Sequence, residues 1–152
     1  MPIREKTIKI LATFFYVGYL PLIPGTFGSL AGLLLYYLAG GKVVLLTLVI
    51  LVLGFLVSGE AERATGRKDN RVIVIDEVAG MLLSLLFVPF APKFMLIGFL
   101  VFRFFDMVKP YPCGAFQKLK GSAGIMSDDI IAALYTNLAL QLILRFASLR
   151  LS

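Results

Sequence analysis

The chain has 152 residues, of which 59% are hydrophobic and 16% are charged, and its formal net charge is +6. Soluble domains carry about 25% charged residues, so this composition predicts a membrane protein. The basic residues form no run interleaved with aromatic residues, which argues against a nucleic-acid partner. One cysteine and no histidine exclude a disulfide framework, a multi-thiolate metal site and imidazole-dependent catalysis.

The hydrophobic residues fall into successive segments, at about 10–23, 28–39, 43–58, 72–90, 94–108 and 129–148. A spanning helix needs about 20 apolar residues, and the fourth and sixth segments meet that length. The third does so when it extends past Gly59, whereas the second and fifth need flanking residues. Pro21 and Pro24 interrupt the first segment, which we expect to lie in the membrane interface or to re-enter.

The sequence contains no internal repeat or linker. We therefore predict a single all-α domain over residues 1–152. It is expected to be a multihelical integral membrane bundle with about four to five spanning helices plus an N-terminal interfacial or re-entrant segment. No obligate protein partner is expected.

Charge asymmetry predicts how the bundle lies in the membrane. If the N-terminus, the 59–71 loop and the 103–128 region share one side, eleven of the fifteen Lys and Arg residues lie there. All nine acids lie on or near the same side. Because Lys and Arg accumulate in cytoplasmic loops, we expect this side to be cytoplasmic.

The stretch PGTFGS at 24–29 is a Pro-Gly turn that leads into an apolar helix. One interpretation is a turn followed by an N-cap at a Thr or Ser, here Thr26 or Ser29. The other is a phosphate site, because free N–H groups at a helix start attract anions and Gly25 and Gly28 let a ligand come close.

Asp69 precedes an apolar run that contains two adjacent acids, Asp76 and Glu77. Asp69 alone is typical of a solvated loop or a helix cap. A charged side chain within a membrane segment costs about 2.5–3.5 kcal/mol on insertion scales, so Asp76 and Glu77 need partners. Those partners are either Arg or Lys in a structural pair, or a metal ion.

The stretch FLVFRFFDMVKPYP at 99–112 places Arg103, Asp106 and Lys109 three residues apart, on one helical stripe. A salt bridge between Arg103 and Asp106 is one explanation of that pair. Lys109 and Pro110 predict the end of the helix, because a residue before proline is disfavoured in the α region.

The stretch GSAGIMSDDII at 121–131 places Asp128 and Asp129 at the start of the last apolar segment. Acids there are ordinary helix caps. The alternative is that acids from four segments converge near Arg103 and Lys109. An oxygen-only cluster suits Mg²⁺, and nearby cations suit a phosphate. The acids concerned are Asp69, Asp76, Glu77, Asp106, Asp128 and Asp129.

Other phosphatase chemistries are excluded by the residues. Cys113 has no arginine six residues on, so the phosphate loop of cysteine phosphatases is missing, and no D-x-D-x-T motif occurs. Metal-assisted attack by water is the phosphoryl chemistry that remains.

Four stretches in order resemble the phosphatidylglycerophosphatase A family, bacterial membrane enzymes of glycerophospholipid synthesis. They are P-G-T-x-G-S at 24–29, D-x6-D-E-x2-G at 69–80, F-R-x2-D-x2-K-P-x-P at 102–112 and G-I-M-x-D-D at 124–129. The similarity is collinear from about Gly18 to Asn137. Ala132-Ala133 departs from the expected Ala-Gly, and we expect only a packing consequence.

The resemblance implies Mg²⁺-dependent hydrolysis of the terminal phosphomonoester of phosphatidylglycerophosphate to phosphatidylglycerol and phosphate. It implies a multi-pass protein of the bacterial inner membrane whose site faces the cytoplasm. The six carboxylates correspond to the family's acids and are expected to bind Mg²⁺, with a catalytic role for Asp76, Glu77, Asp106 and Asp129. The substrate phosphate is expected to contact Thr26, Gly28, Ser29, Arg103 and Lys109.

Two alternatives remain. One is a small cation transporter or channel that uses the same acids, although an ion path needs polar groups deep in the spans and these acids lie on one side. The other is a phosphatase of a different lipid phosphate. A CDP-alcohol phosphotransferase is disfavoured because its D-G-x2-A-R spacing is absent.

Overall fold

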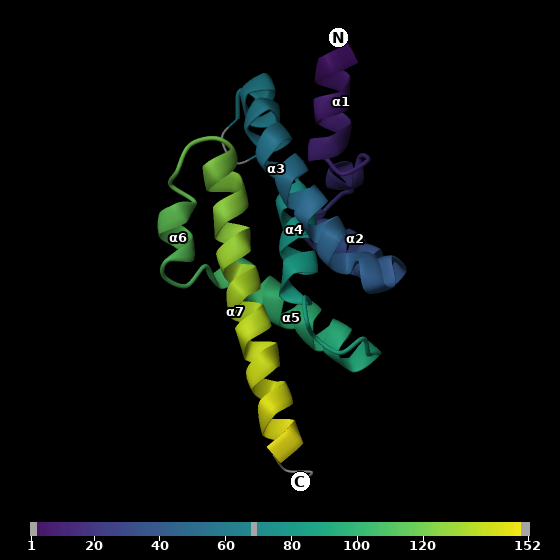
Figure 1. The fold of residues 1–152 in the computed structure, drawn as a ribbon. Helices are drawn as coiled ribbons and strands as arrows, with labels where there is room; N and C mark the ends of the chain where they lie inside the picture. Colours follow the sequence, from purple (N-terminus) through teal and green to yellow (C-terminus); the bar gives the residue numbers. More distant parts are fainter. Residues whose placement is uncertain (1–2, 68–69, 150–152) are drawn as a thin grey trace.

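The computed structural model describes residues 3–67 and 70–149, and within those ranges the chain is helical with no β-strand (Figure 1). This confirms the all-α prediction. Two short 3-10 turns, η1 (Val17–Tyr19) and η2 (Gly40–Lys42), precede the second and third α-helices. The α-helices are α1 (Ile3–Ala12), α2 (Pro24–Ala39), α3 (Val43–Thr65), α4 (Ile75–Ser84), α5 (Pro92–Val108), α6 (Cys113–Phe116) and α7 (Ser122–Leu149).

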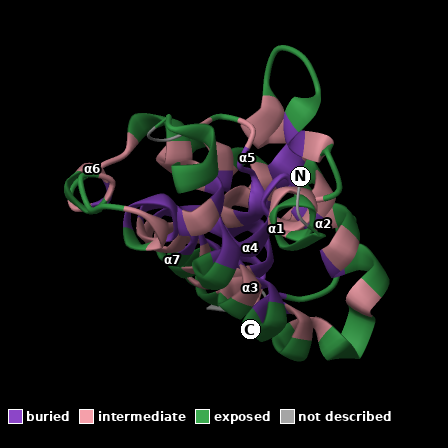
Figure 2. Cartoon of the chain, turned by 90° about the horizontal axis from the view of Figure 1, so that it is seen from above, coloured by how far each residue is buried: buried purple, intermediate pink, exposed green. Residues whose placement is uncertain are grey.

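Helix α4 is the centre of the bundle, and α2, α3, α5 and α7 pack around it (Figure 2). A helix that is apolar on nearly all sides is stable only when its neighbours cover it. The first turn of α4 carries Asp76 and Glu77, so both acids start from the interior of the protein. The buried residues of α4 are Ile75, Val78, Ala79, Gly80, Met81, Leu82 and Ser84.

Glycines bring α2 unusually close to α4. A Cβ added at Gly28 would lie 2.9 Å from Val74 Cβ, and one added at Gly32 would lie 2.8 Å from the carbonyl oxygen of Val78. Small residues four apart allow two helix backbones to approach in this way. The approach places the start of α2 beside the first turn of α4.

Two helical stretches are long and apolar enough to cross a membrane, Pro24–Thr65 and Ser122–Ala147. In each, only 22% of the most apolar window is buried inside the protein, whereas the core helix of a soluble protein is mostly covered. The first stretch comprises α2 and α3, which Gly40 separates with a φ of 52°. The expected number of four to five spans is not confirmed, since only these two stretches of the described residues are long and apolar enough to cross a membrane.

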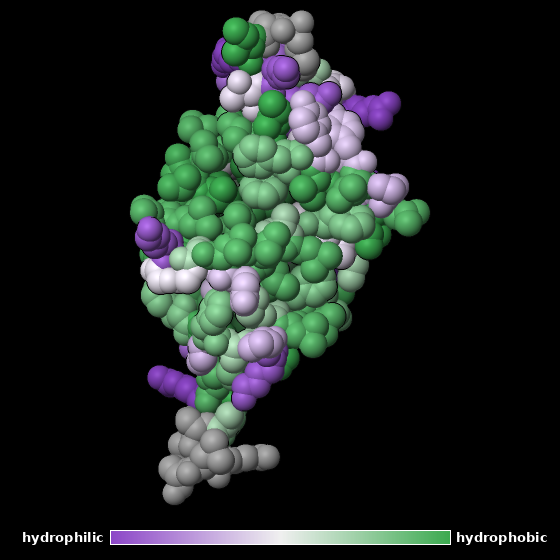
Figure 3. Space-filling view, turned by 90° about the vertical axis from the view of Figure 1, so that its right-hand side faces the viewer, coloured by the Kyte–Doolittle hydropathy of each residue, from purple (hydrophilic) through white to green (hydrophobic). Residues whose placement is uncertain are grey.

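The face of the molecule that Figure 3 shows is largely apolar over its middle. Figure 3 shows a broad hydrophobic belt with polar groups gathered toward both ends. An exposed apolar area of this extent is typical of a membrane or protein contact. Exposed large hydrophobic residues of the protein include Leu38, Leu45, Leu56, Leu100 and Leu138.

The start of α1, the end of α3 and the start of α7 lie at one end of the molecule (Figure 1). Arg4 Nη2 and Glu60 Oε1 are 2.6 Å apart, which links α1 to α3. The backbone N–H of Gly59 donates to Ser122 Oγ at 2.9 Å, which links α3 to α7. Of the segments predicted to share one side, the N-terminus, the end of α3 and the start of α7 thus lie at one end of the bundle.

The expectation that residues 72–90 form a spanning helix is wrong. Helix α4 covers only residues 75–84, about 15 Å at 1.5 Å per residue. The chain then turns through residues 85–91, with Phe87 at a φ of 60°. Hydropathy failed here because the turn is as apolar as the helix.

Residues 10–23 do not form one continuous helix either. Helix α1 ends at Ala12, and Phe14, Phe15 and Tyr16 all have left-handed φ values, between 44° and 69°. Three such residues in a row end a right-handed helix. The predicted interruption is confirmed, although it lies upstream of the two prolines.

Candidate active site

The first turn of α4 and the second turn of α7 bring three carboxylates together. One oxygen from each of Asp76, Glu77 and Asp129 lies within 4.8 Å of the others. Asp76 and Glu77 lie where the α4 dipole favours negative charge. Asp129 comes from the buried side of α7 and is 3% exposed. We call these residues the carboxylate trio.

Each member of the trio has a buried oxygen without a hydrogen-bond partner: Asp76 Oδ1, Glu77 Oε2 and Asp129 Oδ2. Buried charges without partners cost several kcal/mol each, and three like charges also repel one another. A cation among them would satisfy the free oxygens and offset the repulsion. Hard oxygen donors with no nitrogen or sulfur suit Mg²⁺, so the residues present fit the metal that the resemblance implies.

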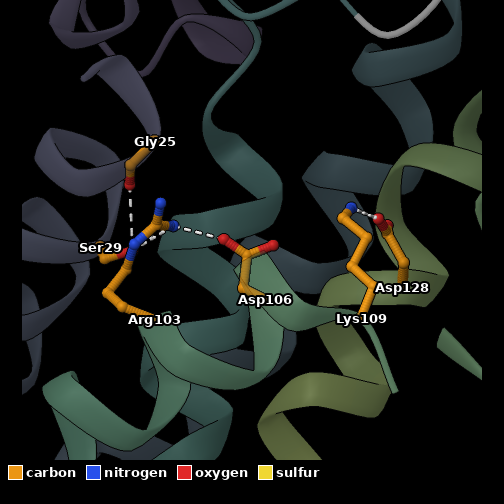
Figure 4. Close-up of polar contacts among 6 residues, drawn as sticks. All are labelled: Gly25, Ser29, Arg103, Asp106, Lys109 and Asp128. Carbon is orange, nitrogen blue, oxygen red and sulfur yellow. Dashed lines mark hydrogen bonds and ion pairs between the residues drawn. The ribbon is translucent and has the colours of Figure 1, made fainter. Parts of the chain in front are cut away.

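Arg103 of α5 lies between Asp106 and the start of α2 (Figure 4). Its Nη1 forms an ion pair with Asp106, one turn along α5, and lies 3.4 Å from Ser29 Oγ. The hydroxyl of Ser29 donates to the carbonyl of Gly25 at 3.0 Å. A Cβ added at Gly25 would lie 2.5 Å from Glu77 Oε1, so the start of α2 touches the trio.

Lys109 supplies a second cation at the end of α5. It has a φ of 47° and forms an ion pair with Asp128 of α7 (Figure 4). Burial acts to lower the pKa of Lys109, but the hydrogen bond to Asp128 and the charges of Asp128, Asp129 and Asp106 outweigh burial and raise that pKa. The ammonium group therefore stays charged.

The predicted acids converge as far as the structure describes them. Asp106 acts electrostatically on Glu77 and Asp129, and Asp128 acts on Asp76 and Asp129. Asp69 lies outside the described residues. Five of the six predicted carboxylates thus interact electrostatically with one another, from α4, α5 and α7.

Two predicted phosphate contacts lie at the start of α2. Thr26 is in its first turn. Gly28 lies farther along, where its missing side chain makes room for Val74 and Glu77. The start of α2 and the guanidinium of Arg103 lie side by side, and a guanidinium favours an anion. The backbone N–H groups of Thr26 and Phe27 already donate to the carbonyl of Ile23.

Several structural interpretations from the sequence are now decided. The Arg103–Asp106 salt bridge is confirmed. A Thr or Ser N-cap on α2 is wrong, because the cap is Ile23 with Pro24 in the first turn. Helix capping by Asp128 and Asp129 is also wrong, because α7 already begins at Ser122.

The thiol of Cys113 is fully buried at the start of α6. Burial raises the pKa of Cys113 above its usual range, so the thiol stays protonated. A protonated, inaccessible thiol is a poor nucleophile, in line with the exclusion of cysteine chemistry.

One residue near α4 was not among the predicted site residues. The amide of Asn137 donates to the carbonyls of Ser84 and Leu86, at the end of α4. The available signal was a polar amide within the apolar segment 129–148.

The helical fold combines exposed apolar surface with a buried cluster of carboxylates and cationic side chains. The chain belongs to the phosphatidylglycerophosphatase A family, because the family model of that description matches residues 10–144. It is thus a phosphatase of phospholipid metabolism.

Three relatives illustrate the family. "Phosphatidylglycerophosphatase A" of Haemophilus influenzae is 38% identical over 135 residues, which cover 84% of this chain and 83% of the relative. The protein of that name from Escherichia coli is 35% identical over 129 residues, 81% and 75% of the two chains. A Bacteroides thetaiotaomicron protein named "Putative phosphatidylinositol-3-phosphatase" is 33% identical over 139 residues, 84% and 87% of the two chains. No solved structure matches the chain.

Proposed function

We propose that the protein removes the terminal phosphate of phosphatidylglycerophosphate, giving phosphatidylglycerol and inorganic phosphate, in a Mg²⁺-dependent reaction at the cytoplasmic face of the membrane. The observation that carries the proposal is the carboxylate trio, whose free buried oxygens need a cation, next to two cationic side chains that suit a phosphate. Family membership supplies the substrate class.

Mg²⁺ would be held by Asp76, Glu77 and Asp129, where it would polarise the phosphoryl oxygens and favour attack by water. Arg103 and the start of α2 bind and orient the terminal phosphate and take up the charge that develops on its oxygens. Lys109 contributes a fixed positive charge on the other side of Asp106. The water oxygen bonds to phosphorus and the bond from phosphorus to the glycerol oxygen breaks. One proton of the water is transferred, in net terms, to the departing glycerol oxygen, which leaves as the alcohol of phosphatidylglycerol.

The apolar belt supports a substrate that stays in its membrane. A lipid whose chains lie against the belt can present its head group to the end of the bundle that carries most of the charged loops. That end is cytoplasmic if the charge asymmetry sets the orientation. The bacterial inner membrane is the compartment that this proposal requires.

A second candidate substrate comes from the Bacteroides relative, whose name points to phosphatidylinositol 3-phosphate. Both lipids carry a phosphomonoester, so Arg103 and the start of α2 could bind either one. The cation-channel alternative receives no such support from the relatives.

The decisive substrate experiment measures phosphate release by the purified protein from each lipid in mixed micelles with Mg²⁺. We expect kcat/KM for phosphatidylglycerophosphate to exceed that for phosphatidylinositol 3-phosphate by at least about tenfold, a difference of 1.4 kcal/mol in transition-state binding. A preference for the inositol lipid would replace the proposed substrate. If the protein released phosphate from neither lipid, the result would favour the cation-channel alternative.

A further inference from the structure

Helices α4 and α7 run side by side in a constant register around the trio. Asp76 on α4 lies close to Asp129 on α7, and eight residues farther along both helices Ser84 lies against Asn137. Between these points, a Cβ added at Gly80 would lie 3.3 Å from the carbonyl oxygen of Asp129. Eight residues are about 12 Å of helix, so α4 and α7 keep the same register over this length.

The end of α4 requires outside partners. The last four carbonyls of a helix accept no hydrogen bond from the helix itself. In apolar surroundings, each carbonyl left without a donor costs several kcal/mol. Asn137 Nδ2 donates to Ser84 O at 3.0 Å and to Leu86 O at 2.7 Å. One amide group thus binds the last residue of α4 and the start of the turn after it.

Two further side chains hold the turn itself. Gln141 Nε2 donates to Phe87 O at 3.1 Å, and the hydroxyl of Tyr36 donates to Val88 O at 3.2 Å. Residues 85–91 contain no polar side chain of their own, so their carbonyls depend on these donors. Of these three donors, Asn137 is the one whose hydrogen bond goes to a residue of α4, Ser84.

We propose that Asn137 is a positioning residue for the carboxylate trio. By binding the end of α4, it fixes how far α4 lies along α7 and therefore how Asp76 and Glu77 face Asp129. Asn137 and Asp129 belong to the same helix. If α4 shifts along α7 at Asn137, Asp76 and Glu77 therefore shift by the same distance relative to Asp129. The proposal rests on the proposed function, since it takes the trio as the Mg²⁺ site.

The binding of a small cation depends on the spacing of its ligands. Mg²⁺ demands near-ideal octahedral geometry, so a shift of about half an ångström between α4 and α7 weakens the site. Residues that orient metal ligands from outside the site typically change metal affinity by about 10–100-fold when they are replaced. Asn137 is expected to act within that range.

The test compares Asn137→Leu, which keeps the side-chain size and removes both donors, with Gln141→Leu, which removes one donor to the turn only. Asn137→Ser, with a single short donor, is the milder variant and keeps the test usable if Asn137→Leu does not fold. Binding of Mg²⁺ to the purified, detergent-solubilised full chain is measured by calorimetry, beside the metal-free melting temperature. Both values are referred to the amount of folded protein.

We expect the Kd for Mg²⁺ to rise about tenfold or more in Asn137→Leu and by a smaller factor in Asn137→Ser, with less than about a twofold change in Gln141→Leu. Parental Mg²⁺ affinity in either folded Asn137 variant, even with a lower melting temperature, would show a merely structural role and overturn the inference. Absence of Mg²⁺ binding by the parent would instead overturn the proposed function. The parent titration therefore separates the two failures.

Discussion

At the scale of single residues, the carboxylates of the site lie in two different electrostatic environments. Asp76 and Asp129 carry buried oxygens without partners, whereas Asp106 and Asp128 are paired with Arg103 and Lys109. A metal ligand without its metal is destabilised by like charges, and a carboxylate in a salt bridge is stabilised by its partner. The same substitution is therefore expected to have opposite effects on stability at the two kinds of position.

Asp129→Asn should lower turnover per folded molecule by about 100-fold or more, because Asn keeps the shape but removes the charge that holds Mg²⁺. The metal-free variant should melt no lower than the metal-free parent, since one of three crowded charges is gone. Asp76→Asn should behave in the same way. Activity assays beside metal-free melting curves test this, and unstable but active variants would show that these acids are structural.

Asp106→Asn should lower the metal-free melting temperature below that of Asp129→Asn. The side chains of Arg103 and Asp106 are 15% and 11% exposed, so the substitution leaves a largely buried guanidinium without its ion-pair partner. Breaking a buried pair costs about 3–5 kcal/mol, and the remaining exposure reduces that cost here. Equal melting temperatures for the two variants would contradict the distinction between metal ligand and salt bridge.

Cys113→Ser should keep most of the parental turnover. The thiol is fully buried and burial raises its pKa, so it takes no part in the chemistry. Phosphate release per folded molecule is the measurement. A loss of turnover without loss of folded protein would bring covalent catalysis back into consideration.

At the scale of elements, the sequence predicted what short-range rules determine. The spacing of Arg103 and Asp106 predicted their ion pair, and Pro110 predicted the end of α5, which the structure places at Val108. The length of α4 and the start of α7 at Ser122 were not predictable in this way. Both depend on contacts between distant segments: Asn137 at the end of α4, and Gly59 with Ser122 at the start of α7. Convergence of the acids was predicted from their number and side, but their division into a trio and two ion pairs required the structure.

The packing of α2 on α4 leads to a prediction for Gly32. A Cβ at Gly32 would lie 2.8 Å from Val78 O and 2.9 Å from Met81 Cβ, so Gly32→Ala should push the helices apart. The expected loss of stability is about 1–3 kcal/mol, as for other overpacked cores. Gly41→Ala is the matched control, because nothing lies within 4 Å of its Cβ, and it should be nearly neutral. Equal melting temperatures for both variants would contradict the close approach of α2 and α4.

At the scale of the whole molecule, the apolar belt and the distribution of charge predict an orientation. The end that carries the start of α7 should face the cytoplasm, and η2 should lie toward the opposite side. In a Cys113→Ser background, Lys120→Cys in intact cells should resist a membrane-impermeant thiol reagent, and Lys42→Cys should react with it. Labelling of Lys120→Cys from outside would reverse the orientation and move the site to the other face.

The central claim is that the carboxylate trio works as a Mg²⁺ site in lipid phosphate hydrolysis. It is tested most directly by phosphate release from phosphatidylglycerophosphate by the purified protein, first after exhaustive chelation and then during titration with Mg²⁺. We predict no turnover after chelation, full recovery with Mg²⁺ in the parent, and no recovery in Asp129→Asn at Mg²⁺ concentrations that saturate the parent. Full turnover by the chelated parent would contradict the claim.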